Sequence, residues 1–306
     1  MLKLARLTLT ALLLAPLLTA TGQEPVPYSA EGADSCLLCH EDETVLPIFQ
    51  TKHGVPSDPS SPFGQGQLQC EACHGPGGNH TKRPPEGEDR TPVITYAADD
   101  PTTVVTQNGM CLDCHESDVG FGWHNGAHAV DEVACGSCHS VHEAHDPVSR
   151  TSTQPAVCFD CHQQVRSQTM KAFAHPITQG KMDCTGCHSP HGDDSGGGFQ
   201  QLTTNDTCNQ CHAEKRGPVL WEHAPVSEDC GLCHEPHGST QPGMLTKRAP
   251  LLCQSCHSQA GHPSVAFDTS GLPDGMPSQY LLGQSCLNCH TQVHGSNHPS
   301  GSKLMR

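Results

Sequence analysis

The cysteines of this chain occur only in pairs, and every pair is followed at once by a histidine. All 20 cysteines of the 306-residue sequence fall into ten copies of the pattern Cys-X-X-Cys-His, so none is left over. Two thiols three residues apart can add across the two vinyl groups of one porphyrin, and the adjacent histidine then reaches the iron. We therefore predict ten covalently attached c-type haems, and we number the motifs in chain order. The predicted attachment residues are Cys36, Cys39, Cys70, Cys73, Cys111, Cys114, Cys135, Cys138, Cys158, Cys161, Cys184, Cys187, Cys208, Cys211, Cys230, Cys233, Cys253, Cys256, Cys286 and Cys289. The predicted proximal iron ligands are His40, His74, His115, His139, His162, His188, His212, His234, His257 and His290.

Zinc sites and disulfides also use closely spaced cysteines. A zinc ribbon needs Cys-X-X-Cys pairs but no histidine directly after each one. An even number of cysteines would permit disulfides in an exported protein. The histidine that follows all ten pairs favours haem attachment over both alternatives.

Thirteen of the 23 histidines lie outside the motifs, which is enough to give every iron a second ligand. One histidine before a motif and another shortly after its proximal histidine recur, as His128 and His142 do around His139. A histidine three residues after the proximal one cannot easily reach the opposite face of the same haem, so we expect it to bind a neighbouring iron. The methionines show no regular spacing from the motifs, and we interpret them as packing residues. We predict ten haems with two histidine ligands each and no open iron; the pairing of distal histidines with motifs stays open at this point. The predicted distal ligands are His53, His80, His128, His142, His175, His191, His223, His237, His262 and His294, with His124, His145 and His298 as surplus.

The composition is poor in residues that build a polypeptide core. Hydrophobic residues make up 34% of the chain with the cysteines included, aromatic residues only 4%, and there are 30 glycines and 25 prolines. We therefore expect haems to fill the interior. The motifs follow one another at intervals of 22 to 41 residues, which is typical of a repeat architecture. The predicted fold is an elongated multihaem cytochrome c, mostly loop, with short α-helices packed around a serial stack of ten haems and negligible β-structure.

Few segments have the composition of a longer helix. Residues 163–173 lack glycine and proline and are the best helix candidate, while residues 213–223 are a second, interrupted one. The cysteine-free stretches 82–109, 192–207 and 268–284 are predicted to be surface loops.

Residues 1–22 have the pattern of a signal peptide, with Lys3 and Arg6 ahead of an apolar run and small residues near a cleavage site. The apolar run is too short to span a bilayer comfortably, so we expect a soluble mature protein in an exported compartment. We divide the remainder into an N-terminal haem group, residues 23–173 with haems one to five, and a C-terminal group, residues 174–306 with haems six to ten. The formal charge of −16 argues against nucleic acid as a partner.

Several stretches carry a resemblance to a known family. The sequences LQCEACHGPGGNHTK, VACGSCHSVHEAHDPV and CHAEKRGPVLWEHAPVSEDCGLCHEPHGS resemble the periplasmic decahaem c-type cytochromes of the MtrA and DmsE type, and the likeness extends over nearly the whole mature chain. The resemblance implies a periplasmic protein associated with the outer membrane. It further implies a β-barrel of the MtrB type and periplasmic electron-transfer cytochromes as partners, with an extracellular multihaem cytochrome or reductase beyond them.

Three functions fit these observations. The favoured one is a non-enzymatic electron conduit between periplasm and cell exterior, because closed irons can pass electrons but cannot bind a substrate. The second is a multihaem reductase with one open catalytic haem, which the surplus of histidines disfavours. The third is a soluble periplasmic electron shuttle, which uses the same chemistry and is disfavoured only by the family resemblance.

Overall fold

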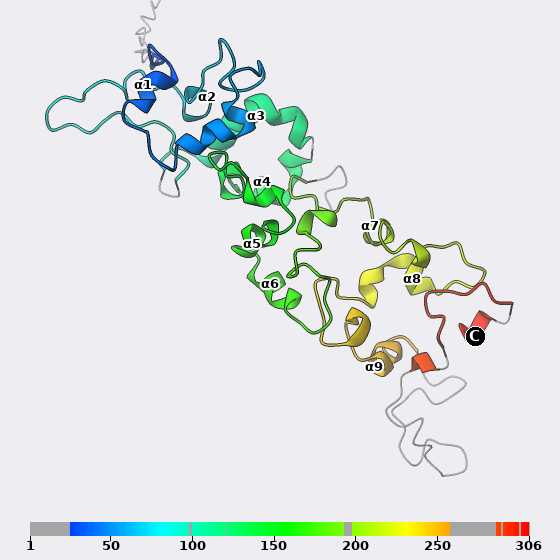
Figure 1. Ribbon diagram of the computed structural model, residues 1–306. Coiled ribbons are helices and arrows are strands. Elements are labelled where there is room, and N and C mark those ends of the chain that lie inside the picture. The colour runs from blue at the N-terminus through cyan, green and yellow to red at the C-terminus, as the bar shows by residue number, and fades with distance from the viewer. Residues whose placement is uncertain are drawn as a thin grey trace, which may run out of the picture.

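The computed structural model describes residues 25–97, 100–120, 122–192, 198–257, 286–288, 290–299 and 301–305. The chain is elongated, and its N-terminal and C-terminal segments lie at opposite ends (Figure 1). The predicted signal peptide, the distal candidate His262, the predicted loop 268–284 and the attachment residue Cys289 lie outside the described residues.

The described elements are short helices joined by loops. The α-helices are α1 (Ala33–Leu37), α2 (Glu71–His74), α3 (Val104–Val119), α4 (Ala127–Val130), α5 (Gln154–Phe159), α6 (Gln163–Thr169), α7 (Thr204–Asn209), α8 (Ala224–Glu228) and α9 (Ala249–Gln254). The 3₁₀ helices are η1 (Leu46–Gln50), η2 (Lys52–Gly54), η3 (Trp123–Asn125), η4 (Cys135–Ser137), η5 (Pro147–Ser149), η6 (Cys184–Gly186), η7 (Ala213–Lys215), η8 (Cys230–Leu232), η9 (Pro242–Met244), η11 (Cys286–Asn288) and η12 (Gly301–Lys303). Within the described ranges, β-structure is limited to isolated bridges, and no helix there is long and apolar enough to cross a membrane. The predicted architecture of short helices and loops with negligible β-structure is confirmed.

The helices differ from the predictions in four places. Helix α7 begins at Thr204, inside the predicted loop 192–207, where the Thr203 hydroxyl caps it by accepting from the Asp206 N–H. Helix α6 begins directly after His162 as predicted but ends at Thr169, because residue 173 pairs with Ser239 in a backbone bridge. In the second predicted helix only η7 forms, since a glycine and a proline follow it. The loop prediction for residues 82–109 is wrong at its end. Helix α3 begins there at Val104, despite the low helix propensity of β-branched residues, because the Thr103 hydroxyl caps it by accepting from the Thr106 N–H.

The helices follow a repeat of two motifs. In odd-numbered motifs the first cysteine lies in an α-helix, namely α1, α3, α5, α7 or α9. In the fourth, sixth, eighth and tenth motifs the first cysteine begins a 3₁₀ helix, namely η4, η6, η8 or η11. The second motif differs, because its first cysteine precedes the short helix α2. An odd-numbered motif and the next even-numbered one therefore form one structural module.

A side-chain amide holds three of these modules together. An Asn or Gln lies three or four residues before the first cysteine of the odd-numbered motif, and its carbonyl oxygen accepts the backbone N–H of the first cysteine of the next motif. These bonds run from Cys135 to Asn108 (2.8 Å), from Cys184 to Gln154 (2.9 Å) and from Cys230 to Asn205 (2.7 Å). Leaving a buried amide without its hydrogen bonds costs free energy of folding. We therefore infer that these side-chain amides, which we call amide clips, fix the relative position of the two motifs of a module.

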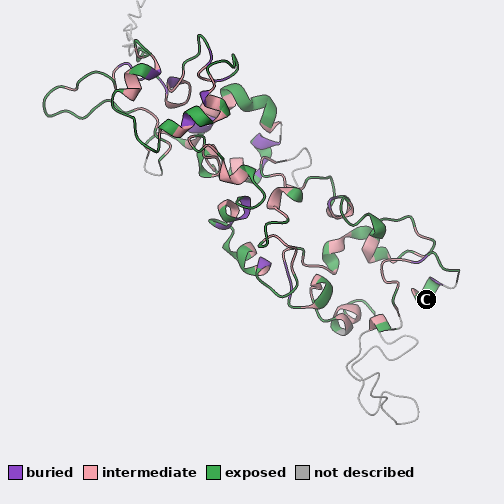
Figure 2. Cartoon of the chain, in the orientation of Figure 1, coloured by how far each residue is buried: buried purple, intermediate pink, exposed green. Residues whose placement is uncertain are grey.

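The polypeptide itself buries little apolar surface. In the described part of the chain, the buried hydrophobic residues are Ala33, Ile48, Trp123 and Phe159, and Figure 2 shows the buried positions as scattered patches along the chain. Leu38, between the cysteines of the first motif, is 84% exposed. The described side chains therefore do not form a continuous hydrophobic core.

Candidate haem-binding sites

Each motif folds as a single helical turn. The histidine N–H donates to the carbonyl of the first cysteine at 2.9–3.1 Å in the motifs outside α3, for example from His40 to Cys36 and from His188 to Cys184. This turn brings the two thiols and the imidazole of one motif together. The cysteines of the described ranges are not in disulfides, and all are at least partly accessible. The local geometry therefore suits attachment of a porphyrin at two thiols with the histidine beneath it.

A cavity of about 2970 Å³ runs through the first part of the molecule. Cysteines and histidines of the first six motifs line it, together with Cys208 of the seventh. An ordinary pocket for one small ligand measures about 300–1,000 Å³. The cavity is therefore large enough for several cofactor-sized groups placed in a row.

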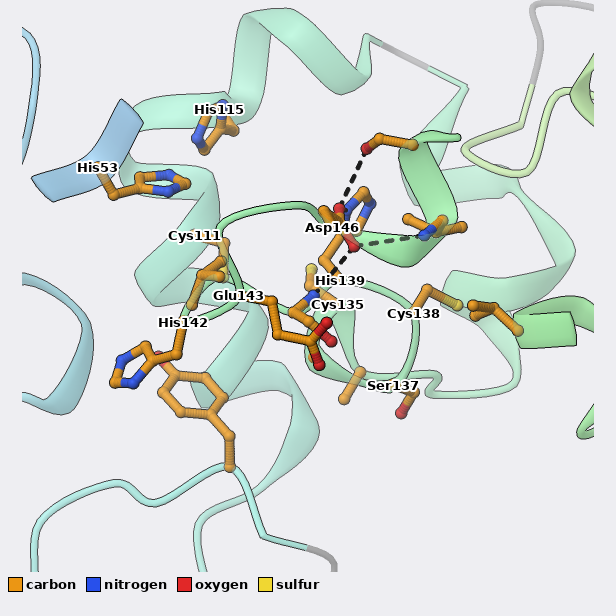
Figure 3. Close-up of a pocket in the computed structure, with 18 of the residues that line it drawn as sticks. His53, Cys111, His115, Cys135, Ser137, Cys138, His139, His142, Glu143 and Asp146 are labelled. Atoms are coloured by element: carbon orange, nitrogen blue, oxygen red, sulfur yellow. Dashed lines mark hydrogen bonds and ion pairs between the residues drawn. The ribbon is translucent and has the colours of Figure 1, made fainter. Parts of the chain in front are cut away.

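Nine proximal histidines each face one of the histidines predicted as distal ligands. The pairs, with the distances between ring centroids, are His40 and His80 (6.3 Å), His74 and His142 (6.0 Å), His115 and His53 (5.9 Å), His139 and His191 (6.0 Å), His162 and His128 (6.1 Å), His188 and His237 (5.9 Å), His212 and His175 (6.3 Å), His234 and His294 (6.1 Å), and His257 and His223 (6.1 Å). Figure 3 shows the pair of His53 and His115 beside the fourth motif.

The spacing of these pairs fits an iron between the two rings. An imidazole nitrogen binds a metal ion at about 2 Å, so two imidazoles on opposite sides of one iron have centroids about 6 Å apart. Both ring planes then contain the line through the iron, which leaves the angle between the planes free. The observed angles range from 13° for His234 and His294 to 78° for His53 and His115. A nearly constant centroid distance with a variable angle is compatible with two imidazoles that share one iron.

The partner of each proximal histidine lies far away in the sequence. His142 faces His74, and the histidine three residues before it, His139, faces His191 instead. Of the histidines interpreted as surplus, His124 binds the Glu116 carboxylate through Nε2 at 2.7 Å, so the nitrogen that would face an iron is already engaged. The structure also describes His290, the predicted proximal histidine of the tenth motif.

Five of the nine distal candidates in the described ranges are oriented by a hydrogen bond at their second ring nitrogen. In each of them Nδ1 donates to a backbone carbonyl, which leaves Nε2 as the nitrogen that faces the partner ring. These bonds are His80 to Thr91 (2.7 Å), His128 to Pro190 (2.9 Å), His142 to Thr44 (3.1 Å), His175 to Pro236 (2.7 Å) and His223 to Val293 (2.9 Å). Residues 190, 236 and 293 each directly precede another distal candidate, so one turn of backbone positions two ligands.

The surroundings of the histidines favour the neutral imidazole. Burial, and after it the facing histidine, lower the pKa of His53, His191 and His237. A histidine must be neutral to bind a metal ion. The pKa shifts therefore favour the form that can act as a ligand.

Successive motifs lie close together at their cysteines, in chain order. Within a module the two first cysteines are near neighbours: Cys36 and Cys70, Cys111 and Cys135, Cys158 and Cys184, Cys208 and Cys230, and Cys253 and Cys286. Between modules the second cysteines are close: burial raises the pKa of Cys73, Cys138, Cys187 and Cys233, and Cys114, Cys161, Cys211 and Cys256, respectively, raise it further. The attachment points thus form one continuous series.

Two regions of the chain match family models of c-type cytochromes. Residues 175–217 and 223–262 match the doubled CXXCH motif, and residues 70–155 match the NrfB-like c-type cytochrome protein. The multiheme cytochrome MtrA of Shewanella baltica (strain OS185) is 46% identical over 282 residues, which cover 91% of this chain and 83% of that protein. The chain belongs to the MtrA family of multihaem cytochromes.

Two more distant relatives cover parts of this MtrA-family chain. The cytochrome c-type protein NrfB of Escherichia coli O6:H1 is 28% identical over 137 residues, 44% of this chain and 66% of NrfB. NrfB of Haemophilus influenzae is 28% identical over 119 residues, 37% of this chain and 52% of that protein. The MtrA-family chain is therefore an electron-transfer protein that carries c-type haems and is not an enzyme, which confirms the favoured class of function.

Sequence reasoning missed the residues that hold the ligands in place. The amides of Asn108, Gln154 and Asn205 could have been found, because each stands at nearly the same distance before an odd-numbered motif. The carbonyls that orient the distal histidines have no signal in the sequence, since any residue can supply a carbonyl.

Proposed function

We propose that each of the ten motifs binds one c-type haem, with the facing histidine pairs as axial ligands and His262 as the partner of His290. The observation that carries the proposal is the row of nine facing histidine pairs, each with centroids about 6 Å apart. Each haem, when bound, supplies a one-electron redox couple. The chain's own residues attach it, close both axial positions and set its distance from the next one.

We further propose that this MtrA-family chain conducts electrons along its length, between periplasm and cell exterior. The support is the series of neighbouring cysteines, which extends from the first motif to the tenth. In a serial arrangement every site is needed, because an electron has no second route. The division into two haem groups, residues 23–173 and 174–306, is still a prediction. It is separate from the two-motif modules that the structure shows.

The location and the partners belong to the same proposal. Residues 1–22 direct export to the periplasm, and the elongated chain associates with the outer membrane inside a β-barrel of the MtrB type. Periplasmic electron-transfer cytochromes exchange electrons with one end, and an extracellular multihaem cytochrome or reductase with the other. The family membership and the elongated shape support this arrangement.

Removing one haem from the middle of the chain tests conduction. In cells that lack the native copy, the Cys184→Ala/Cys187→Ala variant loses the sixth attachment site. We expect reduction of a membrane-impermeant ferric chelate outside the cells to fall at least about tenfold, because the series is interrupted. The measurement is the rate of external iron reduction, normalised to the amount of haem-stained protein.

The matched control is His124→Ala, which changes a histidine outside the facing pairs and should leave the rate unchanged. External reduction at the full rate with the haem-depleted variant would contradict conduction through the chain. Recovery of the protein from the soluble periplasmic fraction alone, without a co-purifying β-barrel, would favour the shuttle.

A further inference from the structure

The second ring nitrogen of a proximal histidine has a regular partner in the even-numbered motifs. In four of them Nδ1 donates to a backbone carbonyl: His74 to Ile94, His188 to Gly198 (3.3 Å), His234 to Gly243 (2.8 Å) and His290 to Lys303 (2.7 Å). The fourth motif departs from this rule. Its His139 donates to the carboxylate of Asp146 at 2.7 Å.

The Asp146 carboxylate is held firmly in this position. Oδ1 accepts the backbone N–H groups of Ser140 (3.2 Å) and Val148 (3.4 Å), and Oδ2 accepts the Ser149 hydroxyl (3.1 Å) as well as His139. Asp146 also caps the 3₁₀ helix η5, and its side chain is 24% exposed. Figure 3 shows the carboxylate among these partners, beside the ring of His139.

The proximal histidine of the third motif also donates to a carboxylate, so the two carboxylates can be compared. Asp118 accepts from Nδ1 of His115 at 2.8 Å, almost the same distance, but its side chain is 67% exposed. Water and salt screen an exposed charge far better than a partly buried one. Asp146 should therefore act more strongly on its histidine than Asp118 does.

The opposite side of the same site is partly shielded from water. The distal candidate His191 packs against the indole of Trp123 with centroids 6.0 Å apart, and Trp123 is only 7% exposed. A charge near this site is therefore screened less than a charge at a fully exposed position.

We propose that Asp146 is a positioning residue that gives the haem of the fourth motif a lower reduction potential than the haems whose proximal histidine donates to a carbonyl. A carboxylate at Nδ1 makes the imidazole a stronger electron donor to iron, and its charge favours ferric over ferrous iron. Reduction of this haem adds one electron to the iron, and no bond forms or breaks.

The inference rests on the proposed function, because it takes the fourth motif to hold a haem between His139 and His191. Its consequence is one haem of low potential within the row, which electrons cross on the way between the third and the fifth haem. Electrons then occupy the fourth haem only briefly and are held mainly by the haems before and after it.

The test is a redox titration that isolates the fourth haem. In the His191→Ala background this haem should be the only high-spin one, so its ferric EPR signal reports its midpoint alone. Adding Asp146→Asn, which keeps the shape and removes the charge, should favour reduction at least tenfold at a given potential, which is about 59 mV for a one-electron couple. Asp146→Glu, which keeps the charge, should restore most of the difference.

The matched control is Asp118→Asn in the His53→Ala background, which marks the third haem and should give a clearly smaller shift. A second measurement uses intact ligands: with Asp146→Asn alone, about one tenth of the reducible absorbance should move to a higher potential. Ten haems with an unchanged midpoint would overturn the role of Asp146 and leave the proposed function intact. Absence of the high-spin signal in His191→Ala, with ten haems bound, would overturn the ligand assignment and the inference with it.

Discussion

Replacing His191 by alanine is expected to convert about one haem in ten from low spin to high spin. His191 faces the proximal His139 with a centroid distance of 6.0 Å, so its loss leaves one axial position of that iron without a ligand. The thioether bonds through Cys135 and Cys138 should keep the haem attached. The change is measured by EPR of the oxidised protein and by the spectral shift that carbon monoxide causes in the reduced protein, since CO binds only an open iron.

The matched control for this prediction is His124→Ala. His124 directly follows Trp123, which packs against His191, but its Nε2 is hydrogen-bonded to Glu116, so no iron should lose a ligand. Its haem content and spin state should equal those of the unchanged protein. A His191→Ala protein that stays fully low spin and indifferent to CO would show that His191 is not a ligand.

Replacing Gln154 by leucine is expected to lower the free energy of unfolding by about 2–4 kcal/mol. Gln154 is 5% exposed and clips the fifth and sixth motifs together. Its oxygen accepts from Cys184 (2.9 Å) and Thr185 (3.1 Å), and its amide donates to Val148 (3.0 Å) and to the Thr185 hydroxyl (3.0 Å). Leucine fills a similar volume but removes the partner of the backbone N–H groups of Cys184 and Thr185 and of the Val148 carbonyl.

The unfolding of this variant can be followed in guanidinium chloride through the Soret band, which reports loss of histidine from the iron. The control is Gln164→Leu, an exposed residue of α6, which should change the free energy by no more than about 0.5 kcal/mol. Equal midpoints for the two variants would mean that the amide clip contributes nothing to the module.

The haem motifs could be predicted from the sequence because their chemistry is local. Two thiols and a histidine within five residues bind one cofactor, and the structure forms each motif as one turn. The distal ligands could be predicted only as a set, by counting histidines. Their pairing is a property of the fold, as in His142, which faces His74 and is hydrogen-bonded to Thr44.

The secondary structure was predicted in outline and missed in detail for a physical reason. Helix α3 forms across Val104 and Val105, where local propensity is low. The hydroxyl cap of Thr103 and the amide clip from Asn108 to the fourth motif stabilise it instead. The role of Asp146 was equally hidden, since an aspartate seven residues after a motif gains its meaning only when η5 brings it to His139.

Low-temperature EPR of the oxidised holoprotein, combined with a haem count and CO spectra of the reduced form, tests most directly whether every iron is closed by two histidines. The facing pairs predict about ten haems per chain, all low spin and none altered by CO. A high-spin fraction near one haem in ten that binds CO would contradict this and would give the open-haem alternative its first support.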